Sequence, residues 1–208
     1  MGTLFSEVKK SPNQFLSEID GVSLYLKRED LLHPEISGNK FRKLRYNILE
    51  AQRQGKDKLL TFGGAFSNHI AAAAAAGKEF GIRTVGVIRG EELGQDLDKT
   101  FKENPTLRQA VEHGMELEFL SRDDYRNKTS PEILEKLSLR YGNPYLLPEG
   151  GTNDLAIKGC EEILSDEDRD FDLICCAIGT GGTISGIIVT YKEVELTLDE
   201  AFHGEILD

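Results

Sequence analysis

A lysine beside a glycine turn is the residue of this sequence best placed to do chemistry. Lys40 follows Gly38 and Asn39, and it opens a basic stretch that continues with Arg42, Lys43 and Arg45. Taken alone, such a stretch is typical of a solvated helix face, and that interpretation stays open at this point. Lys40 differs because a turn can desolvate its amine, and a neutral amine attacks carbonyl compounds to form a Schiff base. Lys40 is therefore a candidate catalytic residue.

A second turn could hold a small anion. Gly63 and Gly64 end an apolar run, and Ser67, Asn68 and His69 follow immediately before a run of six alanines. Free amides at the start of a helix favour an anion such as a carboxylate, and the side chains of Ser67 and Asn68 add donors. A plain helix cap would explain either Ser67 or Asn68. It would not explain the two glycines together with both of these residues.

A third turn has the composition of a phosphate-binding loop. Its residues are glycines and hydroxyl donors: Gly179, Thr180, Gly181, Gly182 and Thr183. Glycines let a phosphate approach the backbone amides, and threonines add donors. A dinucleotide fingerprint would need glycine in place of Ile184, and a nucleotide P-loop would need lysine in place of Ile187. The turn is therefore predicted to bind a monophosphate, with a purely structural glycine turn as the alternative.

The other candidates are weaker. A fourth turn, residues 148–153, could line the same cleft or be an ordinary loop. The acidic stretches 91–92 and 166–170 are predicted to be solvated loops, and no metal site is predicted. Cys160, Cys175 and Cys176 suit buried reduced thiols better than a disulfide framework.

Alternating strands and helices must position these turns. Apolar runs predict strands over residues 22–27, 58–62, 84–88, 116–120, 145–147 and 173–178. Helical patterns lie between them, over residues 41–54, 69–80, 98–112, 131–140, 154–164 and 183–191. This alternation predicts an α/β fold with mainly parallel open sheets and flanking helices, in which ligand sites lie at the carboxyl ends of strands.

The charge balance argues against two classes of partner. The 208-residue chain has a formal net charge of −11 and a pI near 4.9. Such a balance repels nucleic acid and anionic lipid, so we expect neither as a partner. No secretory signal and no apolar run of membrane-spanning length is visible, which predicts a cytoplasmic protein.

Taken together, the four turns resemble a known family. The blocks Gly-Asn-Lys-x-Arg-Lys-Leu (38–44), Gly-Gly-x-x-Ser-Asn-His (63–69), Pro-Glu-Gly-Gly-Thr-Asn (148–153) and Gly-Thr-Gly-Gly-Thr (179–183) occur in a characteristic order and spacing. The sequence is similar, over roughly residues 10–189, to the 1-aminocyclopropane-1-carboxylate (ACC) deaminase and D-cysteine desulfhydrase family. These enzymes use pyridoxal phosphate (PLP).

The resemblance implies a fold and a role for each motif. It implies the two-domain fold of the tryptophan synthase β type, with a small domain over residues 43–148 and a large cofactor domain from residues 1–42 and 149–208. Lys40 would bind PLP as a Schiff base and move the substrate proton, and Asn68 would bind the cofactor's phenolic oxygen. Ser67, Asn68 and His69 would bind the substrate, with Ser67 also in a catalytic role. The phosphate would lie on Gly179, Thr180, Gly181, Gly182 and Thr183.

The family's substrates are small amino acids, its products are ammonia and a 2-oxo acid, and its members are usually homodimers. The resemblance ends after Ile188, whereas family members continue, so the large domain is expected to be incomplete. Two functions follow as alternatives. One is a PLP-dependent deaminase or desulfhydrase, and the other is a non-catalytic remnant or interaction protein of the same fold.

Overall fold

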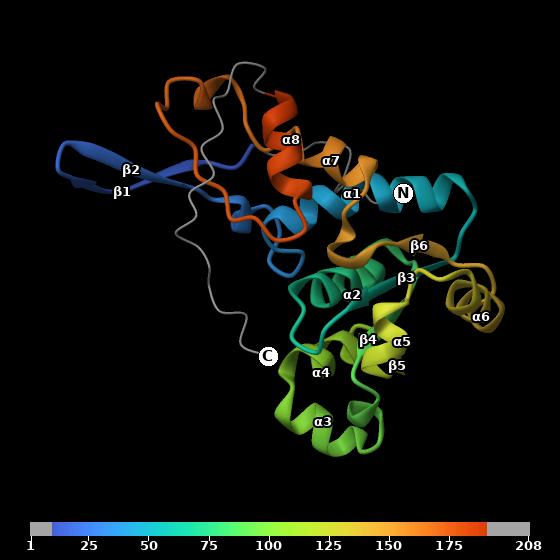
Figure 1. Ribbon diagram of the computed structural model, residues 1–208. Coiled ribbons are helices and arrows are strands. Elements are labelled where there is room, and N and C mark those ends of the chain that lie inside the picture. The colour runs from blue at the N-terminus through green and yellow to red at the C-terminus, as the bar shows by residue number, and fades with distance from the viewer. Residues whose placement is uncertain (1–9, 191–208) are drawn as a thin grey trace.

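A four-stranded parallel sheet forms the centre of the fold. The computed structural model describes residues 10–190 (Figure 1). The sheet comprises β3 (Lys58–Gly63), β4 (Arg83–Arg89), β5 (Glu116–Leu120) and β6 (Tyr145–Leu147), in the order β5-β4-β3-β6. Every residue of β3 is buried, because β3 is paired on both edges and covered on both faces. Its nearly continuous apolar sequence suits that central place.

Helices cover both faces of this sheet. One face packs on α1 (Asn39–Arg53), α2 (Asn68–Phe80) and α4 (Pro105–Glu112), with the alanines of α2 in the core. The opposite face packs on α5 (Arg122–Arg126) and α6 (Pro131–Tyr141) through Tyr125, Leu137 and Tyr141. A further helix, α3 (Leu97–Glu103), precedes α4, and η3 (Glu91–Gly94) follows β4. Alanine side chains let α2 approach the strands closely, which sets the position of the turn before it.

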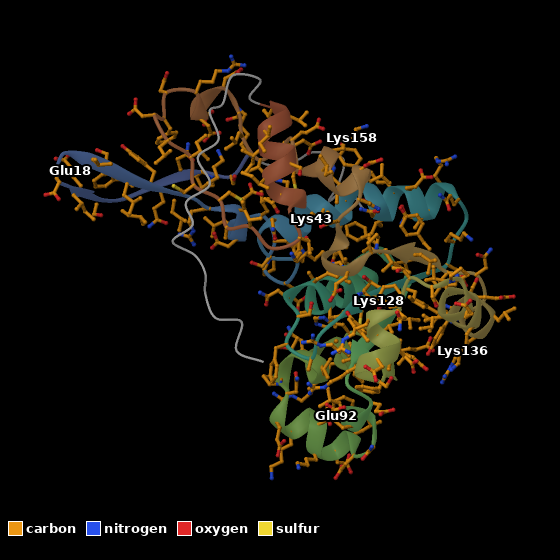
Figure 2. The ribbon with its side chains drawn as sticks, in the orientation of Figure 1. Glu18, Lys43, Glu92, Lys128, Lys136 and Lys158 are labelled. Carbon is orange, nitrogen blue, oxygen red and sulfur yellow. The ribbon has the colours of Figure 1, made fainter. Side chains whose placement is uncertain are left out.

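A second group of elements lies beyond α1. It contains the antiparallel strands β1 (Asn13–Ile19) and β2 (Val22–Lys27), and the helices α7 (Asp154–Cys160) and α8 (Gly182–Thr190). Three short helical turns, η2 (Glu29–Leu31), η4 (Glu149–Gly151) and η5 (Asp166–Asp168), link these elements. Helix α7 packs between α1 and α8, while the hairpin projects from the body with Glu18 near its tip (Figures 1 and 2).

The α/β class with a parallel sheet and flanking helices is confirmed, and several elements differ from the sequence prediction. Residues 173–178 are not a strand, since they pair with no neighbour within residues 10–190 and expose Leu173 and Ile178. The helix expected over residues 98–112 is two helices, because Asn104 is extended before Pro105 and caps α4. Helix α7 ends at Cys160 rather than at residue 164, and β1 was not predicted.

Two expectations about burial are also corrected. Cys160 is buried, but Cys175 is exposed and Cys176 is half-buried; all three are free thiols. The acidic stretch 166–170 is not wholly solvated, because Asp168 is only 2% exposed and binds Lys27. Within residues 10–190, no helix combines the length and the apolar composition that crossing a bilayer requires.

Candidate functional site

A small cavity lies where the start of α1 meets the glycine turn before α8. Its volume is about 70 Å³, and α1 contributes Asn39, Lys40 and Lys43 to its lining. The other side is formed by residues 177–181, 183 and 184. The first and third turns of the sequence, separated by about 140 residues, are thus adjacent in the fold.

A direct hydrogen bond holds the two sides of the cavity together. The Asn39 side-chain amide donates to Thr183 Oγ1 at 2.7 Å. Asn39 is the first residue of α1, and Gly38 before it adopts a φ of 61°, a left-handed conformation that glycine tolerates best. The turn therefore places Lys40 in the first turn of the helix, facing the glycine loop.

The amine of Lys40 is easier to deprotonate than an ordinary lysine amine. Its pKa is lowered, first by burial and then by the nearby charge of Lys43, and Cys160 opposes the shift only in part. Burial and a like charge both disfavour the ammonium form. A larger neutral fraction at physiological pH is what a nucleophilic or proton-transferring lysine requires.

Lys43 is a buried lysine whose amine contacts hydroxyl groups and no carboxylate within the described part of the chain. Its side chain is 2% exposed, and its Nζ donates to Thr152 Oγ1 at 3.1 Å and to Thr180 Oγ1 at 3.5 Å. Within residues 10–190 it forms no salt bridge, and burial lowers its pKa. Figure 2 shows Lys43 where α1 lies beside α8. A buried ammonium held only by hydroxyl groups is well suited to bind an anion.

The glycine turn leaves room for that anion. Gly179 and Gly181 have open space where a Cβ would stand, and Gly181 has a φ of 80°. A Cβ on Gly182 would lie 3.1 Å from Lys43 Nζ and 2.9 Å from Thr152 Oγ1, so only glycine permits this approach. Open backbone, hydroxyl groups and an ammonium together form a donor set that fits a phosphate group.

The second turn does not line this cavity. Ser67 caps α2, and its Oγ accepts hydrogen bonds from the amides of His69 and Ile70 at 3.2 and 3.4 Å. Asn68 is the first residue of α2 and its side chain is exposed, whereas His69 is buried. The three residues predicted to bind substrate thus have three different environments.

His69 is a neutral imidazole with a defined tautomer. Thr61 Oγ1 donates to the carbonyl oxygen of Leu147 at 3.0 Å, so at 2.8 Å it accepts from His69 Nε2. The Nδ1 atom is therefore an acceptor, and it is buried without a partner among the residues described. Burial first, and then the charges of Lys40 and Lys43, lower the pKa of His69 to about 3. The ring cannot act as a cation near neutral pH.

The fourth turn, residues 148–153, contacts each of the other three turns. From the sequence it could equally have been an ordinary loop. Gly151 has a φ of 70°, and a Cβ there would lie 2.9 Å from the His69 ring. The next residue, Thr152, contacts Lys43 and lies 2.5 Å from Thr180, between their Oγ1 atoms. Lys43 and Thr152 were not singled out from the sequence. The spacing of Lys43 from Lys40 was the available signal, since residues three apart share one helix face.

Several characterised or named proteins are similar in sequence to most of this chain. A putative ACC deaminase of Thermotoga maritima is 35% identical, over 86% of this chain and 58% of its own length. The bifunctional D-cysteine desulfhydrase/ACC deaminase of Arabidopsis thaliana is 34% identical, over 81% of this chain and 45% of its own length. A D-cysteine desulfhydrase of Serratia proteamaculans is 28% identical. The chain thus spans about half the length of these relatives.

A solved structure and a family model agree with this likeness. The crystal structure of an ACC deaminase homologue superimposes with a TM-score of 0.67 at 29% identity, and covers 90% of this chain and 60% of that one. The family model described as pyridoxal-phosphate dependent enzyme matches residues 8–201, which extends past Ile188, where the resemblance was expected to end. A match over most of the sequence shows the family. This chain belongs to the pyridoxal-phosphate dependent enzymes.

Proposed function

We propose that the cavity between α1 and the glycine turn binds PLP and that the protein deaminates a small amino acid. The observation that carries this proposal is the pairing of Lys40 and Lys43. A half-buried lysine at the start of α1 and a fully buried lysine held by hydroxyl groups, both with lowered pKa values, line the same small cavity as an open glycine turn. An aldehyde and a phosphate on one ligand need these two kinds of group.

The cofactor's contacts follow from the donors available. Lys40 would hold it covalently, and Lys43 with residues 179–183 would bind its phosphate. Asn68, whose exposed side chain stands at the start of α2, would bind the ring oxygen. When bound, PLP supplies the electron sink that labilises bonds at the substrate's α-carbon.

The protein's own groups would bind the substrate and move its proton. The amides at the start of α2 and the Ser67 hydroxyl would hold the substrate carboxylate. Lys40, with its lowered pKa, is suited to accept and return a proton at Nζ. His69 stays neutral, so it would act as a hydrogen-bond acceptor through Nδ1 and not as a charged donor.

The names of the relatives suggest two substrates. ACC and water would give ammonia and a 2-oxo acid. D-cysteine and water would give ammonia, a 2-oxo acid and sulfide. We also keep as proposals a homodimer, a cytoplasmic location, and the division into a small domain (43–148) and a large domain (1–42 and 149–208).

Product assays test this function. The purified protein, supplied with PLP, is incubated with ACC, D-cysteine or L-cysteine, and ammonia, 2-oxo acid and sulfide are measured. We expect a 2-oxo acid from ACC or D-cysteine, and none from the Lys40→Ala variant. Cofactor binding without any product would favour the non-catalytic alternative, and absence of cofactor binding would contradict the proposal as a whole.

A further inference from the structure

A pair of amide side chains, Asn47 (buried) and Asn153 (half-buried), joins α1 to the start of α7. Asn153 Nδ2 donates to Asn47 Oδ1 at 2.7 Å, and Asn47 Nδ2 donates back to Asn153 Oδ1 at 3.2 Å. Asn47 is fully buried and also donates to the carbonyl oxygen of Lys43 at 2.8 Å. Tyr145 completes the set by donating to Asn47 Oδ1 at 3.0 Å. Asn47 thus satisfies both donors and both lone pairs of its amide.

This pair fixes two residues of the candidate phosphate site. Asn47 stands one helical turn after Lys43 and binds its backbone. Asn153 caps α7 by accepting from the amide of Ala156 at 2.9 Å, and the residue before it is Thr152. Thr152 holds the ammonium of Lys43 at 3.1 Å. The amide pair therefore connects the backbone of Lys43 with the residue that orients its Nζ.

Capping of α7 does not by itself require the paired amides of Asn47 and Asn153. A serine at position 153 could accept from the amide of Ala156, because capping uses one oxygen. The second contact, to Asn47, adds nothing to the cap, and its partner is a fully buried polar side chain. Buried polar groups that hydrogen-bond one another fix a single geometry.

We propose that Asn47 and Asn153 are positioning residues that orient Lys43 toward a bound phosphate group. That this phosphate belongs to PLP rests on the proposed function. The positioning role predicts an effect that depends on the phosphate group, which a merely structural role would not produce.

The test compares PLP with pyridoxal, which lacks the phosphate. The dissociation constant of each is measured by absorbance titration for the wild-type protein and for Asn153→Ser. We expect PLP affinity to fall about fivefold to tenfold, the effect of losing one or two hydrogen bonds, with pyridoxal affinity unchanged. An unchanged ratio of the two constants would overturn the inference.

Asn104→Ser is the matched control. Asn104 is also a helix cap, and it is buried; it accepts from the amide of Leu107 at 2.9 Å and donates to the carbonyl oxygen of Ala65 at 3.0 Å. The same substitution there keeps the cap and removes one amide contact away from the cavity. We expect it to lower the melting temperature without changing the ratio for PLP and pyridoxal, and an equal change in the ratio would overturn the inference.

A further variant and a further ligand extend the test. If Asn153→Ser fails to fold, Tyr145→Phe removes only the outer hydrogen bond, and a shift of about twofold to threefold in the same ratio is expected; no shift would overturn the inference. Inorganic phosphate is titrated in parallel. Phosphate binding that weakens in Asn153→Ser, in a protein that binds no PLP, would support the inference while contradicting the proposed function. Binding of neither ligand by the wild-type protein would contradict both.

Discussion

At the scale of the residue, two lysines three positions apart have different surroundings. Lys40 is half-buried and faces the glycine turn, whereas Lys43 is fully buried among hydroxyl groups. The charge of Lys43 lowers the pKa of Lys40. Under the proposed function, Lys43 would therefore both bind an anion and lower the pKa of its neighbour.

Replacing Lys43 by methionine separates these effects. Lys43→Met keeps the side-chain length and removes the charge, so we expect PLP affinity to fall about tenfold or more. The pKa of Lys40 is expected to rise, because a like charge has been removed. Competitive acylation of Lys40 across a pH series measures that shift. Lys136→Met, on the exposed side of α6, is the control and should leave both quantities unchanged. An unchanged Lys40 pKa in Lys43→Met would contradict this account.

His69 makes stability depend on pH. Its pKa is lowered from 6.5 to about 3 in the folded protein, so below pH 6.5 the unfolded chain binds a proton that the folded protein does not. The contribution of His69 is present above pH 6.5 and is lost as pH falls toward 3. We expect the free energy of unfolding to decline by about 1 kcal/mol per pH unit more between pH 6 and 4 in the wild type than in His69→Gln. Urea unfolding at several pH values measures it, and equal slopes would show that His69 is not buried as a neutral ring.

At the scale of the element, the crossing of α1 and α7 positions the site. Gly159 of α7 lies directly on the backbone of α1, and a Cβ there would stand 2.0 Å from the carbonyl oxygen of Arg42. Neither backbone can yield without moving its helix. Helix α1 carries Lys40 and Lys43, and α7 begins shortly after Thr152. The crossing of the two helices therefore sets the distance between Lys43 and Thr152.

Gly159→Ala tests the crossing. We expect a loss of about 2–3 kcal/mol in the free energy of unfolding, the usual cost of overpacking an interior, together with weaker PLP binding. Gly64→Ala is the control, because a Cβ at Gly64 meets nothing within 4 Å. Chemical denaturation compares the two variants. A Gly159→Ala protein as stable as the wild type would contradict the packing described here.

The sequence predicted those elements whose pattern depends on local chemistry. Apolar runs indicated the strands β3, β4, β5 and β6; β3 and β4 are largely buried, whereas β5 and β6 are only partly buried. The run 173–178 has the same composition, but a strand also needs a partner, and pairing is not visible in one run. The residue types of Lys40 and the glycine turns marked them as candidates, and the fold brings Lys40 to the same cavity as residues 179–181 and 183. The contact of Lys43 with Thr152 was not visible in the sequence, because it depends on how α1 and α7 cross.

At the scale of the whole molecule, one buried ion pair joins distant parts of the chain. Asp168 is 2% exposed; its carboxylate accepts from Lys27 Nζ at 2.8 and 2.7 Å and from Asn13 Nδ2 at 2.8 Å. Burial alone would raise the pKa of Asp168, but the bonds from Lys27, Ser165 and Asn13 outweigh it and lower the pKa. Both ends of the β1–β2 hairpin are thereby fixed to η5.

Asp168→Asn tests this connection. We expect it to cost about 2 kcal/mol, because it leaves the half-buried ammonium of Lys27 without its charge partner. Glu167→Gln, at the neighbouring position, removes an ion pair with Lys10 in which both side chains are 67% exposed, and should have no measurable effect. Thermal denaturation of both variants gives the comparison. Equal stability of the two variants would show that the hairpin does not depend on Asp168.

We propose that Lys40, and no other lysine, binds the cofactor covalently. To test this, the protein is saturated with PLP, the complex is reduced with borohydride, and the modified peptide is mapped by mass spectrometry. We expect one label per chain, on Lys40, which persists in Lys43→Met at a saturating cofactor concentration and is absent from Lys40→Ala. A label on Lys43, labels scattered over surface lysines, or no stable label would contradict it.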